Sequence, residues 1–114
     1  MTIWQSHGFK CMSRLSPTGI ACGYVGLDRD HPDFEKHYDK IDIEIHGGLS
    51  YAGYWRDEND GLWYVGFDCG HYDDLDFDPA LGYTVRPRLN KSMTYVEEET
   101  EHLAEQMAKR RGDN

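Results

Sequence analysis

Residues 62–69 form the most apolar run of the chain and read Leu62-Trp63-Tyr64-Val65-Gly66-Phe67-Asp68-Cys69. A run of this length and composition is typical of a strand that is covered on both faces, so it predicts an interior strand of a sheet. The polar segment 56–61 precedes it and predicts an exposed turn. Residues 49–55, which are rich in aromatic side chains, predict the neighbouring strand.

Three more segments toward the N-terminus have strand-like patterns. Residues 8–15 alternate roughly with period two, and residues 20–27 predict a returning strand after the turn-forming residues 16–19. After the polar loop 28–40, residues 41–46 alternate strictly between apolar and polar side chains, which is the plainest strand pattern of the chain.

The hairpin expected between the first two of these strands sets a register for two of the three cysteines. A four-residue loop pairs Leu15 with Ile20. This register predicts Cys11 opposite Tyr24, with Cys22 diagonal to Cys11 on the same face of the sheet. We expect both thiols to behave as small, half-buried apolar groups.

The C-terminal part of the chain predicts one helix over residues 93–111. Thr94 to Glu97 match a capping box, and Gly112 is suited to end the helix. Apolar side chains recur at helical spacing on one face: Met93, Val96, Leu103 and Met107. Residues 70–90 are acidic and then mixed, and their prolines predict a loop.

These elements predict a fold of the α+β class, in which an antiparallel sheet of about five strands carries one C-terminal helix packed on one face. The chain has 114 residues, which suits a single domain over residues 1–114 with one core and no need of disulfides.

The charge balance excludes several classes of function. Lys and Arg number 12 against 21 Asp and Glu, so the net charge is −9, and direct nucleic-acid binding is not expected. No apolar run approaches the roughly 20 residues that span a bilayer, and no signal peptide is recognisable at the N-terminus. An odd cysteine count without an export signal indicates a reduced, cytoplasmic protein.

Polar residues cluster at the ends of the predicted strands and mark a candidate site. If strands 41–46 and 62–69 run parallel to each other, with one strand between them, their ends meet at the same edge of the sheet. The residues that would line a pocket for a small polar ligand there are His31, His46, Gly47, Gly48, Asp68, Cys69, His71 and Asp74. The alternative is structural: a buried Cys69, histidines bonded to loop backbone, and a glycine turn.

Two chemical interpretations use the same residues. His46, Cys69 and His71 are ligand types that suit zinc, with one Asp completing a tetrahedral site. The chain lacks the CxxC or HxxxH spacing of known zinc motifs, so no cofactor is firmly implied. In a hydrolase, Cys69 would be the nucleophile, His46 or His71 the base, and the amides of Gly47 and Gly48 the oxyanion donors.

Aromatic residues make up 13% of the chain, which includes Trp4, Trp55 and Trp63. This is more than one small core needs. Together with the acidic charge, the excess is typical of a face that binds a protein partner.

Four blocks of the chain carry a resemblance: Gly23-Tyr24-Val25-Gly26, His31-Pro32, His46-Gly47-Gly48-Leu49 and Gly66-Phe67-Asp68-Cys69-x-His71. In these blocks the chain resembles a family of small uncharacterised proteins from bacteriophages and actinobacterial genomes. The resemblance covers residues 20–108 and includes the helix. It implies a phage or prophage accessory protein that acts in the host cytoplasm, and it supplies no catalytic residue.

Two functions follow as expectations. The first is an accessory protein that binds a host component, either a protein or a small polar ligand, in the manner of an inhibitor or anti-defence protein. The second is a small Cys/His/Asp hydrolase, with or without zinc, that uses His46, Cys69 and His71. A purely structural phage component is a third alternative, and the sequence does not predict the oligomeric state.

Overall fold

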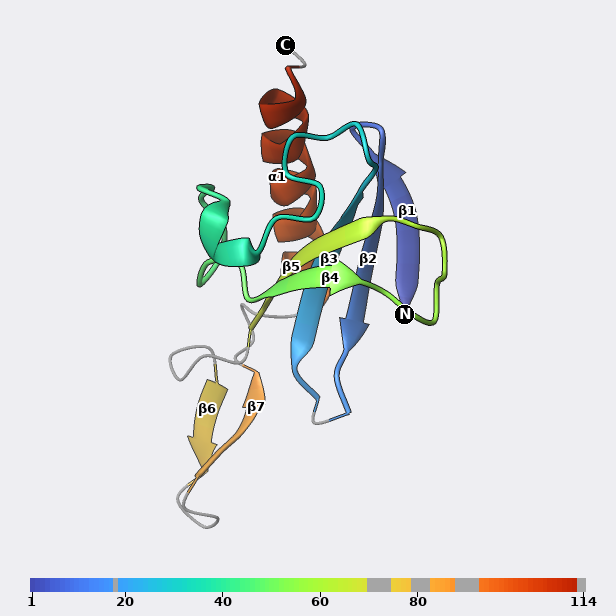
Figure 1. Cartoon of the computed structure of the whole chain (residues 1–114). Helices are drawn as coiled ribbons and strands as arrows, with labels where there is room; N and C mark the ends of the chain where they lie inside the picture. Colours follow the sequence, from blue (N-terminus) through green and yellow to red (C-terminus); the bar gives the residue numbers. More distant parts are fainter. Residues whose placement is uncertain (18, 70–74, 79–82, 88–92, 113–114) are drawn as a thin grey trace.

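The computed structural model describes residues 1–17, 19–69, 75–78, 83–87 and 93–112. Five antiparallel strands form one sheet in the order β1-β2-β3-β5-β4, and a C-terminal helix, α1, packs against it (Figure 1). The elements of this body are β1 (Thr2–Ser6), β2 (Phe9–Leu15), β3 (Ala21–Leu27), the short 3-10 helix η1 (Tyr38–Lys40), β4 (Tyr51–Tyr54), β5 (Trp63–Asp68) and α1 (Met93–Arg111). This is the α+β fold that the sequence predicts.

The strands β2, β3, β4 and β5 lie within the predicted ranges, and β5 is an interior strand that pairs with both β3 and β4. Strand β3 is buried along its whole length because it occupies the middle of the sheet and both of its faces are covered. Interior position thus explains why these two strands read as nearly continuous apolar runs.

Strand β1 was not expected from the sequence. It pairs with β2 through a turn of two residues, His7 and Gly8, whose φ angles are 52° and 82°. Two consecutive residues with positive φ make the type I′ turn that suits a tight hairpin, because its twist matches that of the strands. The turn is hidden in the sequence because His7-Gly8 is not one of the pairs that mark a type I′ turn, namely Asn-Gly, Asp-Gly and Gly-Gly.

The predicted strand 41–46 is wrong as a strand. The side chains do alternate in direction as predicted: the three isoleucines pack against the core and the two acidic residues are exposed. Its backbone, however, pairs with helix side chains. The Glu44 N–H donates to Gln106 Oε1 at 2.8 Å, and Gln106 Nε2 donates to Glu44 O at 2.5 Å. Arg110 also donates to Asp42 O at 3.2 Å. The alternation of apolar and polar residues predicts which side chains face the core, but it does not predict the hydrogen-bond partners of the backbone.

The predicted loop 70–90 also needs correction, because two short strands, β6 (Leu75–Asp78) and β7 (Tyr83–Pro87), lie within it and pair antiparallel. Pro87 is the last residue of β7, where the lack of a backbone N–H removes no hydrogen bond from the interior of the strand pair.

The register of the β2–β3 hairpin differs from the prediction by one residue. Leu15 pairs with Ala21, so Cys11 lies opposite Val25. A shift of one residue turns every side chain to the other face. Cys11 therefore lies in the core beneath α1, and Cys22 lies on the opposite face. Both are free and buried, as are all three cysteines.

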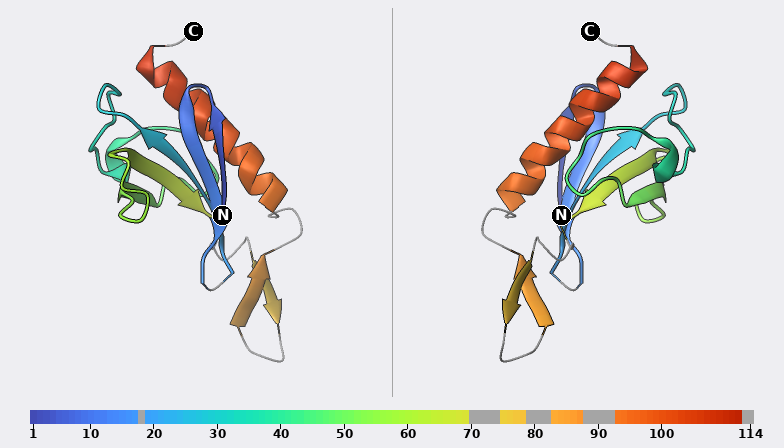
Figure 2. Two further views of the ribbon diagram at one scale, coloured as in Figure 1. Left: turned by 90° about the vertical axis from the view of Figure 1, so that its right-hand side faces the viewer. Right: turned by 90° about the vertical axis from the view of Figure 1, so that its left-hand side faces the viewer.

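Helix α1 covers one face of the sheet, as the two side views in Figure 2 show, and a second buried cluster of Met12, Cys22, Tyr24 and Tyr64 covers part of the other. Gly23 permits the close approach, since a Cβ at this position would lie 2.1 Å from Thr100 Oγ1. The buried positions of the helix include the three predicted apolar residues Val96, Leu103 and Met107. Among the described residues, no helix is long and apolar enough to cross a membrane.

The ends of the helix agree in part with the prediction. Gly112, with φ 101°, follows the last helical residue, and its N–H donates to Lys109 O at 3.0 Å. The helix begins at Met93, however, so Thr94 lies inside the first turn instead of at the N-cap. The residue before Met93 lies outside the described residues.

Candidate functional site

His31, the first of the predicted site residues, is buried beside the C-terminal part of α1. Its Nε2 lies 2.9 Å from Met107 O, and its Nδ1 accepts the Asp33 N–H at 3.0 Å. A carbonyl only accepts, so Nε2 is the donor in this contact. The edge of the His31 ring also meets the Phe9 ring at 5.8 Å. His31 therefore has a structural role in joining the segment 28–50 to the helix.

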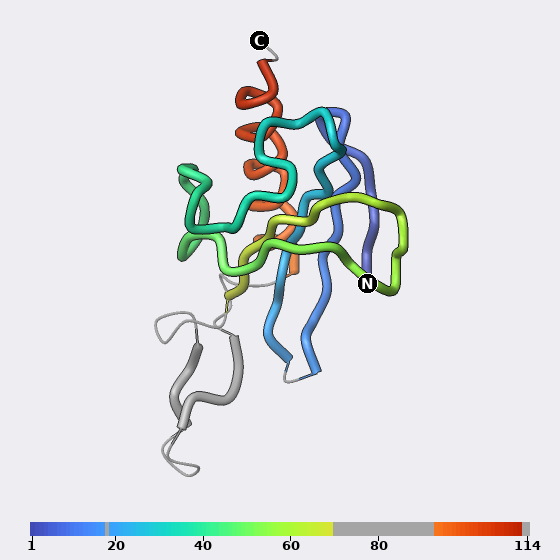
Figure 3. Tube along the Cα trace, in the orientation of Figure 1, coloured from blue at the N-terminus to red at the C-terminus, as the bar shows by residue number. Residues whose placement is uncertain are grey.

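His46 lies near the other end of the same helix, where its Nδ1 is 3.0 Å from the Tyr95 hydroxyl. Gly47 and Gly48 both have positive φ and form the turn that follows, in which the Gly48 N–H donates to Ile45 O at 2.9 Å. The Cα trace in Figure 3 shows how the segment 28–50 runs beside α1 before it enters the sheet. Tyr95 and Met107, the contacts of His46 and His31, are about 18 Å apart along the helix axis.

Asp68 is the last residue of β5 and Cys69 follows it, and their side chains face opposite sides of the sheet. Asp68 accepts a hydrogen bond from Ser50 Oγ at 2.7 Å. Cys69 is 0% exposed and belongs to the core beneath α1. A nucleophile must reach its substrate, so this position gives no support to Cys69 as a catalytic thiol.

His71 and Asp74 lie outside the described residues, so the zinc site and the hydrolase remain predictions. Within the part of the chain that the structure describes, no group of three His, Cys, Asp or Glu side chains could hold a metal ion. Within that same part, the predicted residues that can be placed do not line one pocket: His31 and His46 contact different ends of α1, and Asp68 and Cys69 face different sides of the sheet.

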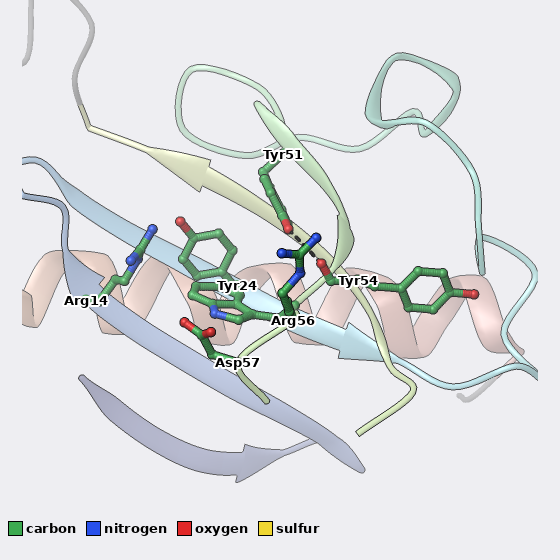
Figure 4. A pocket seen from close by; sticks show the side chains of 7 residues that line it. Arg14, Tyr24, Tyr51, Tyr54, Arg56 and Asp57 are labelled. Atoms are coloured by element: carbon green, nitrogen blue, oxygen red, sulfur yellow. Dashed lines mark hydrogen bonds between the residues drawn. The ribbon is translucent and has the colours of Figure 1, made fainter. Parts of the chain in front are cut away.

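A pocket lies on the other side of the sheet, opposite the helix. It has a volume of about 370 Å³, within the range of small-molecule sites. Figure 4 shows the side chains that line it. We call it the aromatic pocket, and its residues are Arg14, Tyr24, Tyr51, Tyr54, Trp55, Arg56 and Asp57.

The rings of this pocket meet edge to face. Tyr24 is perpendicular to Tyr51, with ring centroids 5.6 Å apart, and to Trp55, with centroids 4.6 Å apart. Trp55 also meets Tyr64 at a steep angle, with ring centroids 5.7 Å apart, so none of these ring pairs is stacked in parallel. Gly66 lies beneath them, because a Cβ at this position would be 2.4 Å from Tyr24 Cδ1.

The turn after β4 is held in place and carries Arg56 and Asp57. The N–H groups of Glu58 and Asn59 both donate to Trp55 O at 3.1 Å. Lys10 reaches across from β2 to Glu58 at 2.7 Å and to Asp60 at 2.8 Å. Hydrogen bonds to Asp60 and Glu58 raise the pKa of Lys10, so it stays charged at neutral pH.

Several donors of the aromatic pocket have no acceptor within the described residues. The Arg14 guanidinium lies 4.9 Å from the Trp55 ring centroid, and its buried Nε has no hydrogen-bond partner. The indoles of Trp4 and Trp63 donate to Glu101 and to Lys36 O, at 2.9 Å each, whereas no acceptor in the described residues meets the Trp55 indole.

Burial raises the pKa of Tyr24 to about 12, so at neutral pH its phenol is an uncharged donor. Two guanidinium groups against the single carboxylate of Asp57 leave the lining of the pocket net positive, in a chain whose net charge is −9.

Comparisons of the chain with family models, curated proteins and solved structures found no match. A second hollow, of about 480 Å³, adjoins the aromatic pocket and shares Arg14, Trp55 and Asp57 with it.

The sequence prediction noted the aromatic excess but did not place it in a pocket. A usable signal was present in the alternation of β2, which puts Met12 and Arg14 on one face. A charged side chain on a face that also carries Met12 and Tyr24 indicates either the rim of a site or an exposed edge. Only the strand order brings Tyr51 and Trp55 next to it.

Proposed function

We propose that this protein binds a small anionic ligand in the aromatic pocket. The observation that carries the proposal is a pair of unused donors there: the buried Arg14 Nε and the indole N–H of the half-buried Trp55 have no acceptor among the described residues. The exposed Arg56 guanidinium adds a second positive charge to the lining of the pocket. Buried or half-buried donors are normally paired, so a ligand that brings acceptors would complete the pocket.

An anion fits better than a neutral or cationic ligand. Guanidinium groups form charge-assisted hydrogen bonds with carboxylates and phosphates, and an aromatic surrounding lowers the local screening of that attraction. The resemblance to small phage and actinobacterial proteins adds the proposal that the ligand comes from a host cell and that binding occurs in its cytoplasm.

The test is a thermal-shift screen of the purified protein against small anions, including phosphorylated sugars, nucleotides, aromatic carboxylates and orthophosphate. A ligand at 100 times its dissociation constant stabilises a protein by about 2.7 kcal/mol, which raises the melting temperature by several degrees in a domain of this size. We expect such a shift from at least one aromatic anion.

Two variants tie the shift to the pocket. Arg56→Gln removes one exposed positive charge of the aromatic pocket and should abolish most of the shift. Lys109→Gln is the matched control, because it removes one exposed charge from α1, on the opposite side of the sheet. Equal shifts in both variants, or no shift with any anion, would contradict the proposal.

A further inference from the structure

We infer that the ligand of the aromatic pocket is a nucleotide of one base, that is, a planar heterocycle joined through a sugar to a phosphate. This inference rests on the proposed function and specifies its ligand class. Three features of the pocket lead to it: the unstacked aromatic rings that line it, the position of the two arginines, and the size of the pocket compared with that of a single anion.

The aromatic rings that line the pocket suit a planar heterocycle. Tyr51 and Trp55 are half-buried, and their planes are inclined at 55°, with centroids 6.2 Å apart. They do not stack on each other. Tyr24 contacts both rings at nearly right angles, and the Arg14 guanidinium lies over the Trp55 ring. Tyr51 is thus fixed by ring contacts none of which is parallel. Aromatic side chains held in this way are the stacking surfaces on which proteins bind nucleic-acid bases.

The arginines suit the phosphate. Arg14 enters from β2 and Arg56 from the turn after β4, and in Figure 4 they lie on either side of Tyr24. The contact with Trp55 restrains the Arg14 side chain before any ligand arrives. A planar guanidinium that is already restrained loses less conformational freedom when it binds a phosphate.

The volume and the charge limit the size of the ligand. A pocket of about 370 Å³ is much larger than a single tetrahedral anion needs, so orthophosphate would leave the rings without a partner. A long nucleic acid is disfavoured because the net charge of −9 repels an extended row of phosphates. A free mononucleotide satisfies both limits.

Isothermal titration calorimetry with a matched set of probes tests the inference. The probes are AMP, adenosine, ribose 5-phosphate, phenyl phosphate and orthophosphate. We expect AMP to bind at least tenfold more tightly than any of the other four, because stacking of a base and charge pairing both contribute only in AMP.

Variants then separate the two halves of the ligand. Arg56→Gln should weaken AMP and leave adenosine unchanged, because Arg56 would contact only the phosphate. Tyr51→Ala should weaken both AMP and adenosine. Lys109→Gln should change neither. Because Arg56 is exposed and has no partner among the described residues, its variant should fold normally, which urea unfolding checks.

The outcomes distinguish the inference from the proposed function. If phenyl phosphate or ribose 5-phosphate binds as tightly as AMP, the pocket does not recognise a base and the inference is overturned, while the anion site stands. If a non-nucleotide aromatic carboxylate from the screen binds and AMP does not, the inference also fails. If no anion of any kind binds, both fail together.

Discussion

Two glycines decide how closely the layers of this protein approach each other. Gly23 lies under Thr100 of the helix, and Gly66 lies under Tyr24 of the aromatic pocket. In a strand interior, a glycine often marks a place where another group comes close to the backbone. The two positions lie on opposite faces, so the same sheet accommodates a helix on one side and a ring cluster on the other.

The substitution Gly66→Ala should destabilise the protein. The added Cβ would be 2.4 Å from Tyr24 Cδ1 and 2.6 Å from Gly23 O, and the backbone oxygen cannot move aside easily. Overpacking of this kind costs about 1–3 kcal/mol, and we expect the upper part of that range in the free energy of unfolding measured with urea.

Gly53→Ala is the matched control, because Gly53 is also a strand glycine and its added Cβ would first meet Tyr51 Oη, at 3.2 Å, the far end of a side chain. A cost below about 1 kcal/mol is expected there. Equal costs at the two positions would show that loss of glycine flexibility in a strand, and not the contact with Tyr24, sets the effect.

At the scale of elements, the segment 41–46 shows how a helix can take the place of a neighbouring strand. The Gln106 amide offers one acceptor and one donor, and both are used by the backbone of Glu44. A peptide group in an adjacent strand would offer the same pair. The segment is thus extended and in alternating contact with the core, yet it belongs to no sheet.

Gln106→Ala should loosen this segment without unfolding the protein. Each lost hydrogen bond costs about 0.5–1.5 kcal/mol, and the exposed position of these bonds favours the lower end of the range. The measurement is amide hydrogen exchange, in which the Glu44 N–H should exchange several times faster than in the original protein.

Glu105→Ala serves as the comparison for Gln106→Ala. It alters the next residue of the helix and removes only an exposed ion pair with Lys109, which contributes little. An unchanged exchange rate at Glu44 in Gln106→Ala would mean that packing of the isoleucines alone holds the segment.

At the scale of the whole molecule, one buried carboxylate links the long segment 28–50 to the end of the chain. The Asp33 side chain is 0% exposed; it accepts two hydrogen bonds from Arg110 of α1 and one from Lys36 at 3.2 Å. Burial opposes its ionisation, but the hydrogen bonds from Arg110 and Lys36 outweigh burial and lower the pKa of Asp33.

The lowered pKa predicts sensitivity to acid. A carboxyl whose pKa is lower in the folded state contributes stability that is complete above its ordinary value of about 4 and is lost as the pH falls through the folded-state pKa. We expect the free energy of unfolding, measured with urea at several pH values, to fall steeply below pH 4.

Asp33→Asn should lower stability at pH 7 and flatten this acid dependence. Breaking a fully buried pair costs about 3–5 kcal/mol. Because the Arg110 side chain is 29% exposed, this pair is only partly buried. We therefore expect the free energy of unfolding at pH 7 to fall by about 2–3 kcal/mol. Asp30→Asn, at an exposed position of the same segment, should keep the original pH dependence; if it flattens the curve equally, Asp33 is not the group responsible.

Local patterns were sufficient for most of the fold. The apolar run 62–69, the strand patterns at 8–15 and 20–27, and the helical spacing over 93–111 predicted four elements and the α+β class, and the structure confirms them. Patterns of this kind depend on residues a few positions apart, and short-range periodicity in the sequence records them directly.

The candidate site was less accessible because it depends on contacts between residues far apart in the chain. The prediction that strand ends would bring His31, His46, Cys69 and Asp68 together depended on a strand at 41–46 that does not form. The β2–β3 register differs by one residue from the predicted one, so Cys11 lies on the face of the sheet opposite to that of Tyr24 and Cys22. Neither error is visible locally, since both arise from which backbone groups pair.

What the sequence by itself determined is therefore the type and approximate extent of the main elements and the side chains that face the core, because these follow from periodicity and composition. What only the tertiary structure decided is the strand order, the register and the pocket. Tyr24 of β3, Tyr51 of β4 and Arg14 of β2 become neighbours only when long-range pairing places their strands in one sheet with those side chains on the same face.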